Sequence, residues 1–224
     1  MREPKIIKEP LPSVSTYKPA NTPLSTLKPV ISNTSLPAEI NLAIPFTSQA
    51  PNQSWVAPYK EFCEEASTFM VSSYIKRQAI TNPDFASQKM LEAKAFEEKR
   101  FGYYEDTSAQ ETAIILTEFY RVDKVKVIYE PKLEDIKQAL AMGKAVIMPA
   151  AGRMLDNPYF QVPGPLYHML VIKGYTKTGN LITNDPGTRH GADFIYTSEV
   201  LMNAMHDWNG GDVNNGRKVI IVIG

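Results

Sequence analysis

Cys63 is the only cysteine of the chain, and its surroundings are those of a helix start. Ala66, Phe69, Met70 and Tyr74 follow it at a helical period. A helix N-terminus presents free N–H groups and a partial positive charge, which favour a thiolate over a thiol. The position therefore indicates a nucleophile, and the alternative is a small apolar side chain on the core face of its helix.

A thiol nucleophile needs a base within hydrogen-bond reach, and His168 is the best candidate. It stands near the start of an apolar segment, residues 167–175, that follows a loop rich in Gly and Pro. This segment and residues 180–183 predict a β-hairpin with its turn at Thr178-Gly179. A histidine at the open end of that hairpin is accessible to a partner; the alternative is a structural histidine bonded to the backbone.

The returning strand of this hairpin leads into Asp185, followed by Pro186 and Gly187. A turn near Gly179 makes residues 168 and 185 neighbours, so that Asp185 accepts the imidazole N–H and fixes its tautomer. The Asp-Pro-Gly sequence is also common turn chemistry. Asn184 is the other candidate for orienting the ring, but alternation along the strand predicts that it points to the opposite face.

Gln49 lies in a loop just past the first predicted strand. A side-chain amide near the thiol would complete an oxyanion hole together with the backbone N–H of Cys63. The simpler interpretation is a solvated loop glutamine.

In order and type these residues resemble papain-like cysteine peptidases, and most closely cysteine peptidase family thirty-nine. The matching motifs are Pro45-x-x-x-Gln49, Cys63-x-x-Ala66-Ser67, His168-x-x-Val171-x-x-Gly174-Tyr175 and Asp185-Pro186, and the resemblance spans residues 40–224. It implies that Cys63 is the nucleophile, His168 the general base and acid, Asp185 the orienting residue and Gln49 the oxyanion donor. It also implies a papain-like fold and peptide substrates.

The sequence departs from the family pattern at Glu64-Glu65, which stand where the family has Gly-Pro. Carboxylates suit the first turn of a helix, but a negative field beside the thiol raises its pKa. The two side chains point toward the sulfur, or are solvated, or pair with a basic group on a substrate. A catalytically silent relative that binds peptides or cell-wall material is therefore the second hypothesis.

The order of elements predicts an α+β domain in which N-terminal helices pack on a mainly antiparallel sheet. Periodicity predicts helices over 62–78, 84–100, 107–120, 131–142 and 198–205, and strands over 41–46, 125–129, 145–148, 167–175, 180–183, 194–196 and 218–223. Asp106 or Thr107 is expected to open the third helix, with Glu111 in its first turn. Residues 149–165 are expected to form a loop.

Composition narrows the class of protein. Lys and Arg number 24, equal to Asp and Glu, so the chain lacks the basic excess of a nucleic-acid binder. The sequence contains no run of about 18 apolar residues, so it predicts no membrane-spanning segment. Metal-ligand and phosphate-loop spacings are also missing, so no metal or cofactor is expected, and the protein is expected to act as a monomer.

Residues 1–37 are rich in Pro, Ser, Thr and Lys and predict a disordered tail or linker, and residues 38–224 predict the peptidase-like domain. A spacer of this kind favours an extracytoplasmic or cell-envelope location if a signal or anchor preceded it, and otherwise a cytoplasmic one. The function expected is hydrolysis of peptide or amide bonds through a thioester acyl-enzyme. Transglutamination or amidase chemistry on cell-wall peptides is an alternative with the same residues.

Overall fold

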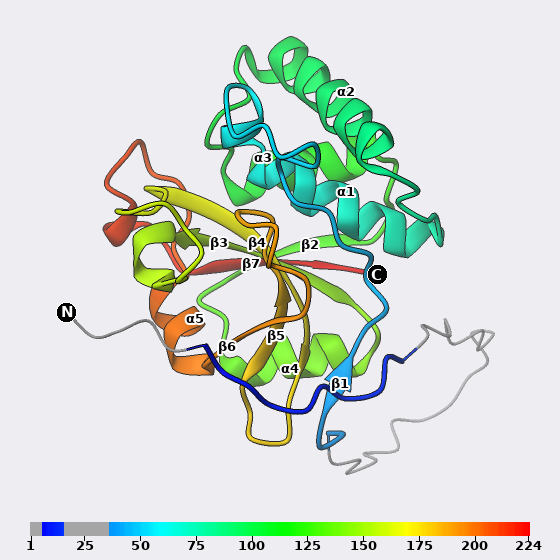
Figure 1. The fold of residues 1–224 in the computed structure, drawn as a ribbon, viewed down its shortest axis with the longest axis vertical. Helices are drawn as coiled ribbons and strands as arrows, with labels where there is room; N and C mark the ends of the chain where they lie inside the picture. Colours follow the sequence, from blue (N-terminus) through cyan, green and yellow to red (C-terminus); the bar gives the residue numbers. More distant parts are fainter. Residues whose placement is uncertain (1–5, 16–35) are drawn as a thin grey trace.

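A computed structural model describes residues 6–15 and 36–224 of the chain. The expected tail at 1–37 lies partly outside these residues, at 1–5 and 16–35. Its described part runs against the domain (Figure 1): the Ser15 N–H donates to the Asn41 carbonyl at 2.8 Å, and Glu9 accepts hydrogen bonds from Thr178 and Asn180. Residues 6–15 are therefore part of the folded structure, because polar groups of the domain bind them. The domain boundary at 37/38 stays a prediction.

The centre of the molecule is a sheet in which every pairing between named strands is antiparallel among the described residues. The strand order is β2-β7-β3-β4-β5-β6, and the short β1 pairs with β4. The strands are β1 Ile40–Asn41, β2 Val125–Tyr129, β3 Ala145–Ala151, β4 Tyr167–Tyr175, β5 Leu181–Asn184, β6 Phe194–Tyr196 and β7 Val219–Ile223. The predicted hairpin is present as β4 and β5, with Gly179 in the left-handed region at φ 89° in the turn between them.

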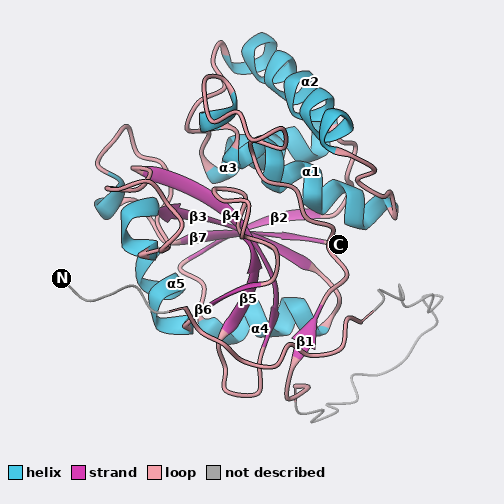
Figure 2. Ribbon diagram, viewed as in Figure 1, coloured by secondary structure: helices cyan, strands magenta, loops and turns pink. Residues whose placement is uncertain are grey.

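Helices lie on both sides of this sheet (Figure 2), with α1, α2 and α3 together on one side. The helices are α1 Cys63–Lys76, α2 Pro83–Phe101, α3 Ala109–Ile114, α4 Leu133–Ala141 and α5 Ser198–Ala204. A π-helical turn, Ile115–Phe119, continues α3. Phe69 on α1 joins the helices through an edge contact with Phe85 of α2 at 5.8 Å and stacking on Tyr120 at 6.5 Å.

Three local predictions were wrong, and each has a physical reason. The strand expected over 41–46 spans only Ile40–Asn41, because the chain then turns and the Ile44 N–H donates to the Leu42 carbonyl at 2.7 Å. The first residue of the capping box at α3 is Ser108 rather than Asp106 or Thr107, because Ser108 lies three residues before Glu111 and bonds it reciprocally. The third strand continues through Pro149 to Ala151 instead of ending at residue 148. The pairing of β3 with β7 ends at Ile147, and beyond it residues 205–206 lie along this edge, where the His206 N–H donates to the Pro149 carbonyl at 3.2 Å. The missing N–H of Pro149 is tolerated because the regular β7 pairing has already ended there.

Gly174 allows β1 to approach β4 closely where the two strands pair, because a Cβ at this position would lie 2.1 Å from the Ile40 carbonyl oxygen. We expect Gly174→Ala to lower the free energy of unfolding by up to about 3 kcal/mol in urea denaturation, since the backbone of β1 must move away. The control Gly210→Ala places its Cβ in open space at φ 84°, and backbone strain alone costs about 1 kcal/mol. Equal losses of unfolding free energy in the two variants would contradict this account of the β1–β4 contact.

Candidate active site

The β4–β5 hairpin brings His168 and Asp185 into contact, as their positions predict. The imidazole Nε2 lies 2.8 Å from Asp185 Oδ1, and both side chains are buried. Asn184 points the other way, as alternation predicts, and its amide donates to the Ile44 carbonyl at 3.0 Å and to the Pro45 carbonyl. The hairpin therefore presents a histidine–carboxylate pair at the start of β4.

Asp185 is held as a carboxylate by four donors. Its Oδ1 accepts from His168 and from the Gly187 N–H at 2.9 Å, and its Oδ2 accepts from Asn157 Nδ2 at 3.0 Å and Tyr196 Oη at 2.5 Å. Burial raises the pKa of Asp185, but His168 and these hydrogen bonds outweigh it, so that the pKa lies below its ordinary value. Sequence reasoning missed Asn157 and Tyr196, which come from segments of the chain separate from that of Asp185. The strand pattern of residues 194–196 could have placed Tyr196 on a strand, but no pattern in the sequence marked Asn157.

An ionised Asp185 can only accept, so the His168 Nε2 must carry the proton and donate it. The neutral ring then leaves Nδ1 as its acceptor. Phe160 packs edge-on against the ring with centroids 5.3 Å apart. Gly152 and Gly187 leave room for it, since a Cβ on either would approach His168 to 3.1 Å and 2.9 Å. The imidazole is therefore fixed in orientation as well as in tautomer.

Cys63 begins α1, as predicted, but its thiol faces a carboxylate. The Sγ–H donates to Glu64 Oε2 at 2.9 Å, and among the described residues no hydrogen bond joins the thiol to His168. Burial first, and then the charges of Glu64, Glu65 and Asp106, raise the pKa of Cys63 well above its ordinary value. The resting form is a protonated thiol, which is the opposite of what the helix N-terminus alone predicts.

The helix that carries Cys63 packs directly on the strand that carries His168. Ser67, one turn along α1, donates its hydroxyl to the Met169 carbonyl at 3.2 Å. Tyr167 precedes His168 on β4, and its pKa is well above its ordinary value, first because of burial and then because of the charges of Glu64, Asp207 and Cys63. The structure thus brings the beginning of α1 to the start of β4, while the thiol bonds the Glu64 carboxyl group and the imidazole bonds the Asp185 carboxylate.

Gln49 connects the two parts of this arrangement. Its backbone N–H donates to the Pro186 carbonyl at 2.9 Å, beside Asp185. Its side-chain amide donates to the carbonyls of Lys60 at 2.8 Å and Tyr59 at 3.1 Å, in the 3-10 turn η1, Tyr59–Glu61, that precedes Cys63. Both amide hydrogens thus have backbone acceptors, and the oxyanion role of Gln49 stays a prediction.

Glu64 and Glu65 are buried, which removes the alternative of solvated side chains, and Glu97 of α2 is buried beside them. As carboxylates, these three residues would leave five oxygens without a hydrogen-bond donor, whereas protonation lets Glu65 and Glu97 share a side-chain hydrogen bond. Burial raises the pKa of Glu64 to about 8 and that of Glu97 to about 9, and the pKa of Glu65 is also well above its ordinary value. The three groups therefore remain largely protonated near neutral pH, and protonation makes their burial tolerable.

In the described part of the chain, no three His, Cys, Asp or Glu side chains are grouped so as to hold a metal ion. None of the helices in residues 6–15 and 36–224 is long and apolar enough to cross a membrane.

Comparison with solved structures identifies the fold as that of papain-like cysteine peptidases. A protein of Bacillus anthracis described as a C39-like peptidase superposes with a TM-score of 0.53 at 15% identity, covering 81% of this chain and 95% of its own. A fragment of prointerpain A from Prevotella intermedia superposes with a TM-score of 0.55 at 14% identity, covering 90% of this chain and 76% of its own. The expected fold class is confirmed.

The model of the Peptidase_C39 like family matches residues 41–210. The chain therefore belongs to this family, and the family supports a cysteine peptidase-type function. No curated protein matches the chain in sequence.

The buried carboxyl groups predict how stability depends on pH. A carboxyl whose pKa is raised on folding contributes fully below its unfolded pKa, and this contribution is lost as pH rises through the folded value. For Glu97 that window runs from its ordinary pKa of 4.5 to about 9. We expect Glu97→Gln to flatten the loss of unfolding free energy between these pH values, by on the order of a few kcal/mol at the alkaline end.

Denaturation in urea at a series of pH values measures this slope. Glu134→Gln is the control, because Glu134 is an exposed residue in the first turn of α4 and its charge does not contribute to the raised pKa of Glu97. The control should keep the wild-type slope. A Glu97→Gln slope equal to that of the wild type would refute the assignment of a buried, protonated carboxyl.

Proposed function

We propose that the protein is a cysteine-dependent hydrolase that cleaves peptide or amide bonds through Cys63, His168 and Asp185. His168 Nδ1 takes the thiol proton, and the Sγ attacks the carbonyl carbon to form a tetrahedral intermediate. The same nitrogen returns the proton to the departing amine, which leaves a thioester. Water, deprotonated by His168, then attacks the thioester, releases the acid and restores the thiol.

The observation that carries this proposal is the buried His168–Asp185 pair at the start of β4, the strand on which the helix beginning at Cys63 packs. The bond to Nε2 supports the role of His168, because it leaves the other ring nitrogen available to the thiol. Membership of the Peptidase C39-like family supports a peptide as the substrate. Cell-wall peptides remain a proposed substrate, and a cell-envelope location remains a prediction.

Oxyanion stabilisation is assigned to the first turn of α1. The backbone N–H of Cys63 lies at a helix N-terminus, where the helix dipole favours negative charge. Gln49 is assigned the second donor by its resemblance to the family, and it must release one of its two backbone acceptors to act. This exchange has a low cost if the substrate oxygen replaces the lost partner.

Catalysis also requires the thiol to leave Glu64. The Sγ bonds Glu64 Oε2 in the resting state, so a rotation about the Cys63 side chain toward His168 must precede attack. Since the pKa of Cys63 is raised, few resting thiolates exist, and the proton is removed in the reaction itself rather than beforehand. Glu64 therefore acts in this proposal as a restraint on the nucleophile.

The same contact favours a second candidate function. A thiol that stays on Glu64 would leave a catalytically silent protein that binds peptides through the papain-like fold. The two functions differ in the chemical reactivity of Cys63 in the folded protein. Acyl transfer to an amine instead of water, as in a transglutaminase, would use the same residues.

We expect Cys63→Ala to abolish cleavage in a screen of fluorogenic peptides, isopeptides and muropeptides while the melting temperature stays nearly unchanged. In the wild type, iodoacetamide should alkylate Cys63, and His168→Ala should slow this by about tenfold or more, because the general base is lost. His206→Ala is the histidine control, since this ring bonds the Gly216 carbonyl. An inert Cys63 in the folded wild type would favour the silent binder.

Glu64→Gln should shift the thiol titration to lower pH. Glu64 ionises above its pKa of about 8, so it carries a negative charge beside the sulfur at the pH at which the thiol titrates. The rate of iodoacetamide alkylation as a function of pH gives the midpoint, and we expect a fall of about one pH unit or more. Glu199→Gln, at an exposed carboxylate of α5, should keep the wild-type midpoint. A midpoint that stays in place or rises in Glu64→Gln would refute the role of Glu64.

A further inference from the structure

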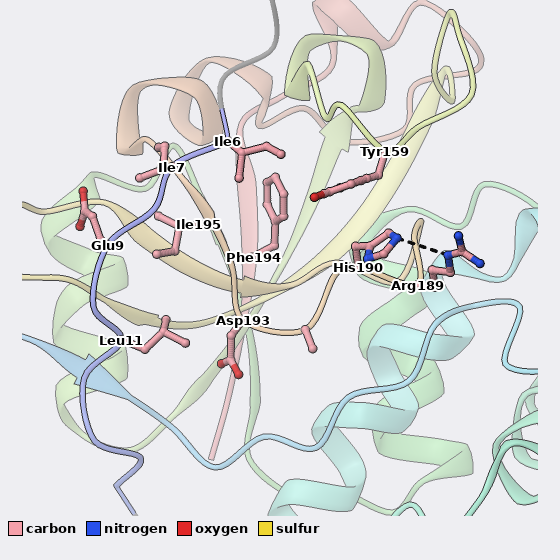
Figure 3. Close-up of a pocket in the computed structure, with 11 residues that line it drawn as sticks. Ile6, Ile7, Glu9, Leu11, Tyr159, Arg189, His190, Asp193, Phe194 and Ile195 are labelled. Carbon is pink, nitrogen blue, oxygen red and sulfur yellow. Dashed lines mark hydrogen bonds between the residues drawn. The ribbon is translucent and has the colours of Figure 1, made fainter.

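A cavity of about 420 Å³ lies between the N-terminal segment and strand β6 (Figure 3). Phe194 and Ile195 of β6 lie across it, and Ile6 forms the side contributed by the N-terminal segment. Tyr159 and His190 form the opposite side, with their rings 4.5 Å apart. The cavity thus combines apolar side chains and an aromatic wall with polar and charged groups, and such a mixed lining can hold a ligand that is partly apolar and partly charged.

Some of the charged side chains around this cavity have charged or polar partners, and others do not. Asp193 forms an ion pair with Lys173 at 2.7 Å, and Glu9 accepts hydrogen bonds from Thr178 and Asn180. Arg189 is exposed and donates only to His190 Nε2, at 3.3 Å. Within residues 6–15 and 36–224, no carboxylate lies within ion-pair distance of its guanidinium. Arg189 lies beyond His190 at the rim of the cavity (Figure 3), and among the described residues its remaining guanidinium donors have no hydrogen-bond partner.

The walls of the cavity belong to the loops that hold the candidate active site. Asn157 accepts the Tyr159 N–H through its Oδ1 at 2.9 Å and donates to Asp185 through its Nδ2. Phe160, the next residue, packs on His168. On the other side, the Asp185 N–H donates to the Gly191 carbonyl at 2.9 Å, which closes the loop that carries Arg189 and His190.

We propose that this cavity is a peptide-binding subsite that takes an apolar residue against Phe194 and Tyr159 and its neighbouring carboxylate on Arg189. A guanidinium binds a carboxylate through two parallel N–H donors, and aromatic rings bury an apolar side chain at little entropic cost. The carboxylate comes either from a peptide C-terminus or from an acidic side chain. That the bound peptide is a substrate rests on the proposed function; its binding does not.

Binding is tested with full-length Cys63→Ala protein by fluorescence polarisation. Three fluorescein-labelled probes are used: Ala-Ala-Ala-Phe with a free carboxylate, the same peptide as an amide, and Ala-Phe-Glu-Ala as an amide. At least one carboxylate probe should bind about tenfold more tightly than the neutral amide, and its affinity should fall as salt rises. The probe that binds better identifies the source of the carboxylate.

Arg189→Gln should remove this tenfold preference, and Arg121→Gln, at an exposed arginine that does not line the cavity, should retain it. Tyr159→Ala should weaken all three probes, with melting temperatures confirming that each variant is folded. Equal binding of acid and amide probes, no binding of any probe, or an unchanged preference in Arg189→Gln would each overturn the proposal. Iodoacetamide labelling of the wild type tests the proposed function separately, so the two failures are distinguishable.

Discussion

The burial of strand β4 is the constraint on which the rest of the structure depends. All nine of its residues are buried, and it is bonded to β3 and β5 along its edges and to β1 at its far end. The Ser67–Met169 hydrogen bond fixes α1 against it. His168 pairs with Ala150 of β3, and the pairing with β5 begins three residues further on, at Val171. Asp185 and the first turn of α1 are therefore positioned relative to a rigid element.

The buried carboxyl groups at the start of α1 oppose what this scaffold provides. A helix N-terminus favours negative charge, but here burial outweighs the helix dipole and keeps Glu64 and Glu65 largely protonated. Burial first, and then the proximity of Glu64 and its hydrogen bond with Cys63, stabilise the thiol rather than the thiolate. The strand scaffold therefore fixes the orientation of His168, while the hydrogen bond to Glu64 holds the Cys63 thiol.

Local sequence patterns predicted most helices and strands, because the helical and strand periods depend on residues that are close together in the chain. The hairpin at residues 167–184, the helix from Cys63 and the strand Val125–Tyr129 all agree with the structure. The errors at Ser108 and Pro149 fell where a capping geometry or the end of a partner strand decided the outcome. Asn157 and Tyr196 went unnoticed because their contact with Asp185 joins segments that are distant in the chain.

The sequence by itself determined the order of the elements, the family and the adjacency of His168 and Asp185, since a hairpin turn is a local feature. Only the tertiary structure decided that the Cys63 thiol bonds Glu64, that Glu65 and Glu97 are buried together, and that residues 6–15 complete a cavity beside β6. Desolvation and hydrogen-bond partners depend on which distant segments of the chain come into contact, and a local sequence pattern does not specify those contacts.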